Sequence, residues 1–230
     1  MTIGILGAMQ EEIKPLLDYF KDYETIKVGK QNFYHIKYKN KNIYLAYSRI
    51  GKVHAALSAS ILILKFGCEK IIFSGVAGGL ASDLKVGDLL LATKTCQYDV
   101  DISAFGHPLG FIPESSVYME SDKSLNEIAK KVASKLNIKL KEGIIASGDS
   151  FIADAKKKEW LVSNFKASAV EMEGASVAVV CDSLKVPFCL LRSISDSADG
   201  SADVSFDEFL ESSAKVVANF VINMLDNIEG

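Results

Sequence analysis

Short apolar runs alternate along this chain with longer segments whose apolar residues recur at helical spacing. The first run spans Thr2 to Leu6, and residues 52–66 carry apolar positions three and four residues apart. Strands that are buried on both faces need helices to cover them, so this alternation is typical of α/β domains. We therefore expect an α/β fold with a central mixed β-sheet flanked by helices.

The same signals place elements along the whole chain. Apolar or alternating runs predict strands at 2–6, 24–28, 32–38, 41–47, 70–74, 86–92, 94–99, 141–146, 167–171 and 186–194. Helical spacing predicts helices at 10–20, 52–66, 121–136, 155–165, 174–184 and 205–225. Ser121 is the expected start of one helix, and Ser205 and Glu208 have the spacing of a capping box. With no repeat or linker in the sequence, we expect a single domain over residues 1–230.

Composition excludes several classes of protein. The chain has 230 residues, of which 49% are hydrophobic and 24% charged, with a net charge of −3. It therefore has no overall basic field that would attract nucleic acid or an anionic membrane. Its apolar runs are far shorter than the roughly 20 residues that span a bilayer. Since residues 1–7 read as a strand rather than a signal segment, we expect a cytoplasmic protein.

Cysteine and histidine usage gives no sign of a metal site. The 4 cysteines have no CxxC spacing and lie in apolar surroundings, so we expect buried, reduced thiols. The 3 histidines, His35, His54 and His107, lack the spacing of a metal-binding motif. We therefore expect neither a metal nor another cofactor.

Glycines and carboxylates follow several of the predicted strands, where α/β proteins bind ligands. These segments are 7–12, 74–79, 147–152, 171–173 and 192–196. Paired carboxylates suit the cleavage of a glycosidic bond, which needs an acid, a base and charge that stabilises an oxocarbenium-like transition state. Taken singly, each feature also fits a structural role: turn glycines, a helix-start glutamate, a turn aspartate or a core phenylalanine.

The order and spacing of these segments are more specific than any one of them. Segments 4–12, 50–53, 74–79, 147–152, 170–173, 192–196 and 205–209 together closely resemble the 5′-methylthioadenosine/S-adenosylhomocysteine nucleosidases. The resemblance covers essentially the whole chain and implies a nucleoside phosphorylase-like fold. It also implies an N-glycosyl hydrolase that releases adenine from 5′-substituted adenosines. Residues 99–113 resemble the branch that serves menaquinone synthesis and also cleaves 6-amino-6-deoxyfutalosine.

The resemblance implies roles for individual residues. Asp196 would be the general acid toward adenine N7, with Ser195 helping to orient it. Glu12 would deprotonate the attacking water, with Arg192 as a nearby orienting cation. Glu173 would bind the ribose hydroxyls.

Further side chains would complete the substrate pocket. Met172 would pack on the sugar, while Phe151 would stack on adenine and the backbone of Ile152 would read its edge. Met9, Ile50 and Phe206 would line the pocket for the 5′-substituent. Strand alternation places Glu171 on the same side as Glu173 and opposite Met172, which makes Glu171 a neighbour of the site.

Two alternative functions remain open on the sequence. A nucleoside phosphorylase resembles this fold but needs cations for phosphate, and the positions where bacterial purine phosphorylases have arginine and serine carry Phe73 and Val76. A non-catalytic nucleoside-binding protein could share the fold. The presence of Glu12, Glu173 and Asp196 together argues against it.

The largely uncharged segment 101–113 predicts an interface between two copies of the chain. It contains several large apolar residues that a monomer would be expected to cover. The alternative is a loop folded onto its own core. The resemblance favours a homodimer in which Phe105, His107 and Pro113 close the neighbouring site.

Overall fold

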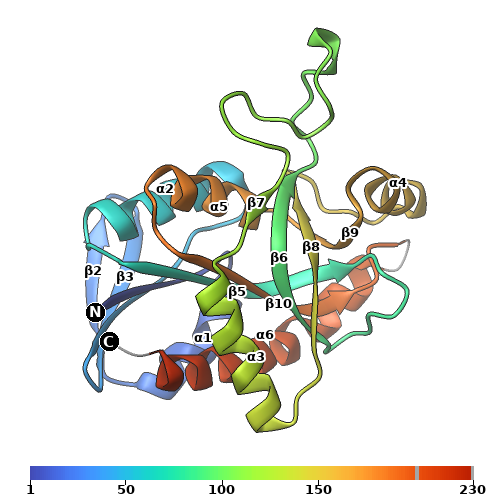
Figure 1. The fold of residues 1–230 in the computed structure, drawn as a ribbon. Coiled ribbons are helices and arrows are strands. Elements are labelled where there is room, and N and C mark those ends of the chain that lie inside the picture. Colours follow the sequence, from blue (N-terminus) through green and yellow to red (C-terminus); the bar gives the residue numbers. More distant parts are fainter. Residues whose placement is uncertain (200–201, 229–230) are drawn as a thin grey trace.

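A mixed β-sheet runs through the protein, which the computed structural model describes over residues 1–199 and 202–228 (Figure 1). Its strands are β1 (Thr2–Gly7), β2 (Glu24–Val28), β3 (Gln31–Tyr38), β4 (Lys41–Tyr47), β5 (Lys70–Gly79), β6 (Leu89–Gln97), β7 (Met119–Glu120), β8 (Leu140–Ser147), β9 (Ala167–Glu171) and β10 (Phe188–Asp196). Parallel and antiparallel pairs both occur, as expected for a mixed sheet.

The sheet has an open part and a closed part. In the open part, β1 pairs with β4, which leads to β3 and β2 at the edge. In the closed part, the order β10-β6-β8-β9-β5 returns on itself because β10 also pairs with β5. The strand ends of this ring and of β1 are thereby brought toward a common centre.

Helices cover both faces of the sheet (Figure 1). They are α1 (Gln10–Phe20), α2 (Lys52–Leu64), α3 (Lys123–Leu136), α4 (Ala155–Phe165), α5 (Gly174–Ser183) and α6 (Ala202–Asn227). A short 3-10 turn, η1 (Ser103–Phe105), lies apart from them in the connection between β6 and β7. Helices α1, α3 and α6 pack one apolar core against the sheet, while α2 and α5 pack a second core on the opposite face. The expected α/β fold is confirmed.

Several predicted boundaries were wrong. Residues 86–92 and 94–99 do not form two strands, because β6 is continuous and bulges between Ala92 and Lys94 in its pairing with β8, which interrupts the alternation. Strand β5 continues through the glycines to Gly79.

Two predicted helix starts were also wrong. Helix α3 begins after Asp122, whose carboxylate accepts from the Leu125 N–H, rather than at Ser121. The expected capping box lies inside α6, because that helix begins at Ala202 and Ser205 is therefore not its first residue.

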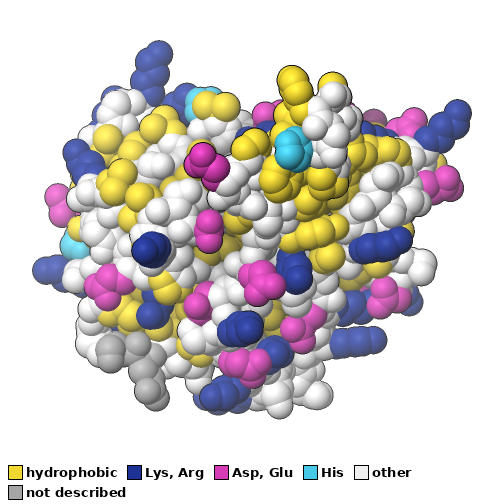
Figure 2. Space-filling view, turned by 45° about the horizontal axis from the view of Figure 1, so that its top comes forward, with side chains coloured by type: hydrophobic (Ala, Val, Ile, Leu, Met, Phe, Trp, Pro, Cys, Tyr) yellow, Lys and Arg dark blue, Asp and Glu magenta, His cyan; other side chains and the backbone are white. Residues whose placement is uncertain are grey.

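The connection between β6 and β7 projects from the body of the molecule (Figure 1). It carries η1 and exposes 82% of Phe105. Figure 2 shows hydrophobic side chains gathered over this projecting part. None of the helices in the described ranges has the length and apolar character needed to cross a bilayer.

Candidate active site

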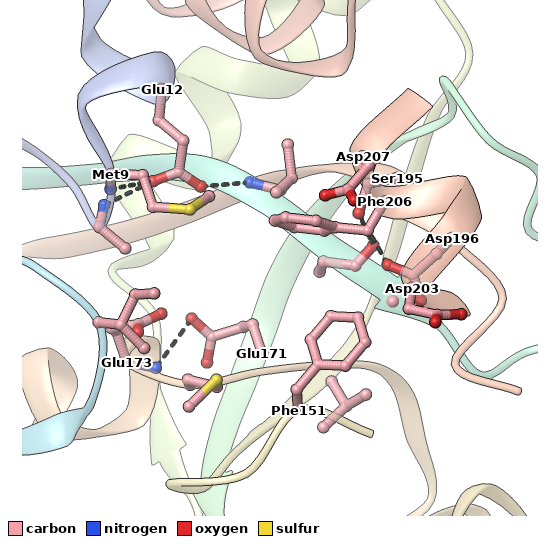
Figure 3. A pocket seen from close by; sticks show the side chains of 17 residues that line it. Met9, Glu12, Phe151, Glu171, Glu173, Ser195, Asp196, Asp203, Phe206 and Asp207 are labelled. Carbon is pink, nitrogen blue, oxygen red and sulfur yellow. Dashed lines mark hydrogen bonds between the residues drawn. The ribbon is translucent and has the colours of Figure 1, made fainter. Parts of the chain in front are cut away.

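A pocket of about 420 Å³ lies where β1, β9 and β10 end (Figure 3). Most of the predicted site residues line it. They are Met9, Glu12, Ile50, Val76, Phe151, Glu171, Met172, Glu173, Ser195, Asp196 and Phe206. Segments that are far apart in the sequence therefore meet in one cavity. Figure 3 shows Glu12 and Asp196 approaching it from opposite sides.

Glu12 is buried on the first turn of α1 and accepts three backbone hydrogen bonds. Its Oε2 accepts from the N–H groups of Ala8 (2.5 Å) and Met9 (3.0 Å), and its Oε1 accepts from Val76 (2.9 Å). A side chain at Gly75 would collide with this carboxylate, which explains the glycine in β5. Burial raises the pKa of Glu12 above its usual range, although Arg192 and the three N–H groups oppose that shift.

Asp196 ends β10 and is also buried. Its Oδ1 accepts from the Ala198 N–H (2.8 Å) and its Oδ2 from the Ser195 hydroxyl (2.9 Å). A Cβ at position 78 would lie 2.8 Å from Oδ1, so Gly78 allows the close approach. Burial raises the pKa of Asp196, which favours the protonated form of the carboxyl.

Glu173 precedes α5 and faces the start of α2. Its Oε1 accepts from the Gly51 N–H at 2.7 Å. Burial and the charge of Glu171 raise the pKa of Glu173 to about 8. The predicted alternation fails here because β9 ends at Glu171, and Glu171, Met172 and Glu173 all line the pocket.

Glu171 uses both carboxylate oxygens within the protein. It accepts from the Gly174 N–H (2.8 and 2.9 Å) and from the Ser147 hydroxyl, and it pairs with the Arg192 guanidinium at 2.5 Å. Arg192 is only 1% exposed and stacks on the Phe73 ring at 4.2 Å. Arg192 is absent from the pocket lining, and its ion-pair partner is Glu171 rather than Glu12.

Aromatic side chains form the wall on the Asp196 side. Phe151 is half-exposed, and its ring meets Phe206 edge to face, with centroids 5.6 Å apart. Ile152 is buried beside the main pocket and lines a small adjoining cavity with Phe151 and Asp196.

The predicted residues of the projecting connection lie outside the pocket. Phe105, His107 and Pro113 are absent from its lining, and His107 stacks on Phe111 with ring centroids 4.7 Å apart. Within one chain these residues do not meet the carboxylates.

Sequence reasoning missed two acidic residues of the site. Asp203 and Asp207 line the pocket from α6, together with Phe206. The spacing of Asp203 and Asp207 was a usable signal, because residues four apart share a face of a helix. It was missed because the helix was expected to start at Ser205, after Asp203.

The pocket is acidic and offers no side-chain cation. Among the described residues that line it there is no lysine, arginine or histidine. No group of three histidine, cysteine or carboxylate side chains in the described part of the chain could hold a metal ion.

The family model described as "Phosphorylase superfamily" matches residues 2–226. The chain belongs to this superfamily. Within it, the chain is 58% identical over 227 residues to an aminodeoxyfutalosine nucleosidase of Helicobacter pylori, covering 98% of this chain and 99% of the relative. It is 40% identical over 230 residues to a 5′-methylthioadenosine/S-adenosylhomocysteine nucleosidase of Actinobacillus succinogenes, covering all of both.

A solved structure agrees with this membership of the phosphorylase superfamily. The Helicobacter pylori 5′-methylthioadenosine/S-adenosylhomocysteine nucleosidase with butyl-thio-DADMe-Immucillin-A superimposes with a TM-score of 0.98, at 58% identity and 99% coverage of each chain. The resemblance to the nucleosidases of this superfamily is thereby confirmed.

Proposed function

We propose that this protein is an N-glycosyl hydrolase that releases adenine from 5′-substituted adenosines. The observation that carries the proposal is the placement of buried carboxyls with raised pKa values, Asp196 on one side of the pocket and Glu12 on the other. Cleavage of a glycosidic bond needs an acid at the leaving group and a base at the water.

In the proposed reaction, protonated Asp196 donates to adenine N7 while Phe151 stacks on the base. The bond between the sugar and the base breaks, and its electron pair goes to adenine. Negative charge around the pocket stabilises the oxocarbenium-like sugar. Glu12 takes a proton from the attacking water, and Glu173 binds the ribose hydroxyls through Oε2, which has no hydrogen-bond partner among the described residues.

Water is the proposed nucleophile, because the described residues that line the pocket include no cation that could hold phosphate. Phe73 is buried under the Arg192 guanidinium, and the Val76 N–H already donates to Glu12. A phosphate ion would instead meet the carboxylates of Glu12 and Glu173.

The test is incubation with 5′-methylthioadenosine in phosphate-free buffer. We expect adenine and methylthioribose in equal amounts. A strict requirement for phosphate would indicate a phosphorylase, and tight binding without turnover would indicate a receptor.

The proposed substrates are 5′-methylthioadenosine, S-adenosylhomocysteine and 6-amino-6-deoxyfutalosine. Relatives named for each activity support them, and the apolar side chains of Met9, Ile50 and Phe206 suit the apolar atoms that adjoin the 5′ carbon. Measurement of kcat/KM for all three on one preparation would rank them. On this proposal the enzyme acts in methionine salvage and in menaquinone synthesis.

We further propose a homodimer in which the partner's segment 101–113 completes the site. Support comes from the exposure of Phe105 and from Ile50, Val53 and Leu57, which are 56%, 78% and 54% exposed around the start of α2.

We also propose a cytoplasmic location, which the 4 cysteines support. They are buried and form no disulfide, and burial raises the pKa of each thiol to about 12.

A further inference from the structure

The start of α2 is held by carboxylates from two distant segments. Gly51, the residue before the helix, has no side chain to cap it, and its N–H donates to Glu173 at 2.7 Å. The next N–H, that of Lys52, donates to Asp149 Oδ1 at 2.8 Å. The positive end of the helix dipole favours both carboxylates there.

Asp99 contacts both Lys52 and Asp149. Its Oδ1 pairs with the Lys52 ammonium at 2.6 Å, and its Oδ2 accepts from the Asp149 N–H at 3.0 Å. The Lys52 ammonium also donates to Gln97 Oε1 at 3.1 Å. Lys52 therefore binds Asp149 through its backbone and Asp99 through its side chain.

This cluster is partly shielded from water. The side chains of Lys52 and Asp99 are 16% and 31% exposed, so their attraction is screened less than that of a surface pair. Gly51 leaves little room for adjustment: its φ is +98°, and a Cβ there would lie 3.1 Å from Asp149 Oδ1.

The cluster connects three parts of the proposed site. Gly51 contacts Glu173, the proposed ribose ligand. Asp149 lies two residues before Phe151, the proposed stacking ring. Asp99 lies at the start of the projecting connection, whose base is closed by the bond from the Gly110 N–H to the Val100 carbonyl at 2.8 Å.

We propose that Lys52, Asp99 and Asp149 are positioning residues that fix Glu173 and Phe151 relative to each other and to the base of the projecting connection. This inference rests on the proposed hydrolase function. Loss of the Lys52 ammonium frees Asp99, whose Oδ2 holds the Asp149 N–H. Asp149 is then held less firmly against the start of α2, which lets Gly51 move away from Glu173. The ribose hydroxyls then lose a fixed acceptor.

The test compares 5′-methylthioadenosine with its 3′-deoxy form, which lacks one of the hydroxyls that Glu173 would bind. In Lys52→Met we expect kcat/KM for 5′-methylthioadenosine to fall by about 10- to 100-fold, the range for a small misplacement of a binding group. The preference for the 3′-hydroxyl should fall as well. Asp99→Asn should change both in the same direction, and Lys52→Arg should restore most of the loss.

Lys39→Met is the matched control, because Lys39 pairs with Asp226 at the same 2.6 Å far from the pocket. It should leave both values unchanged. An active wild-type protein whose Lys52→Met and Asp99→Asn variants keep their preference for the 3′-hydroxyl would overturn the inference. Equal losses on both substrates without rescue by arginine would also overturn it, because they indicate general destabilisation. A wild-type protein that releases no adenine would instead refute the proposed function.

Discussion

The carboxylates of the pocket differ in what their oxygens already accept. Glu171 is fully engaged by Arg192, Ser147 and the start of α5, whereas the carboxyl of Glu173 accepts one hydrogen bond from the described residues, on Oε1. Glu12 and Asp196 lie between these extremes. This difference favours Glu173 over Glu171 as the ligand for ribose, since Glu171 has little capacity left for a substrate.

Replacing Asp196 by asparagine should nearly abolish turnover while an adenine-like ligand still binds. The amide keeps the shape of the carboxyl but cannot deliver its proton, and a positioned acid contributes about 10²- to 10⁴-fold in rate. Single-turnover rates and titration with adenine would measure the two effects. A variant that keeps more than about a tenth of the wild-type kcat would remove Asp196 from the role of acid.

Glu12→Gln should lower hydrolysis by orders of magnitude, because a neutral amide cannot take a proton from water. It should also destabilise the fold. Both oxygens of Glu12 face backbone donors, so the new NH₂ group must oppose one of them, at a cost of about 1 to 3 kcal/mol. Adenine release and urea unfolding would be measured together. Near-normal rates would assign the base elsewhere, with Glu173 or Glu171 next.

Glu173 should make the free protein less stable as the pH rises. Its pKa is about 8 in the folded protein against an ordinary value of 4.5, so the folded state holds this proton more tightly. The stabilisation is complete below about 4.5 and is lost as the pH rises through about 8. Urea unfolding between pH 5 and pH 8 should show a shallower decline in Glu173→Gln, and an unchanged slope would contradict the assignment.

At the scale of elements, the junction between β9 and α5 depends on one buried ion pair. Glu171 caps α5 through the Gly174 N–H, and the Arg192 guanidinium in β10 pairs with the same carboxylate. The Arg192 Nε has no hydrogen-bond partner within the described residues, so the guanidinium is held mainly by Glu171 and by the Phe73 ring. The pair thereby fixes where the Glu173 side chain starts.

Arg192→Met should cost about 3 to 5 kcal/mol of the free energy of unfolding, since it leaves a buried carboxylate without its cation. The double variant Arg192→Met with Glu171→Gln should recover part of that stability, because the unpaired charge is gone. Chemical denaturation of the two variants is the measurement. Equal stability of Arg192→Met and the wild type would show that the pair does not hold the junction.

At the scale of the whole molecule, the projecting connection does not close the proposed site of its own chain. The connection that carries Phe105 and His107 projects from the molecule (Figure 1), and neither residue lines the pocket of its own chain. A symmetric dimer would place the same patch of each subunit at the site of the other.

Mixing two inactive variants tests this arrangement. One chain carries Asp196→Asn, and the other carries Phe105→Asp with His107→Asp. After unfolding and refolding together, a heterodimer places both defects in one site and leaves the other site intact. Activity should rise above that of either parent refolded alone, and the absence of a rise would contradict a site shared between subunits.

The sequence by itself determined the alternation of strands and helices and the residue types at the strand ends. Both follow from local chemistry: apolar spacing reports burial, and a glycine beside a carboxylate reports close approach. The resemblance then picked out Glu12, Glu173 and Asp196 before any geometry was known. The boundaries of strands and helices were harder to predict, as at β6 and at the start of α6. A bulge or an early first helical turn changes the local pattern of apolar residues without a residue type that marks it.

Only the tertiary structure decided which partners these residues meet. Arg192 was expected near the water held by Glu12. Its charge does lower the pKa of Glu12, but its ion-pair partner is Glu171, because β10 and β9 bring those side chains together. The capping of α2 by Glu173 and Asp149 joins residues about a hundred positions apart. Such contacts depend on how strands are ordered in the sheet, and strand order is set by packing of the whole chain rather than by any segment of its sequence.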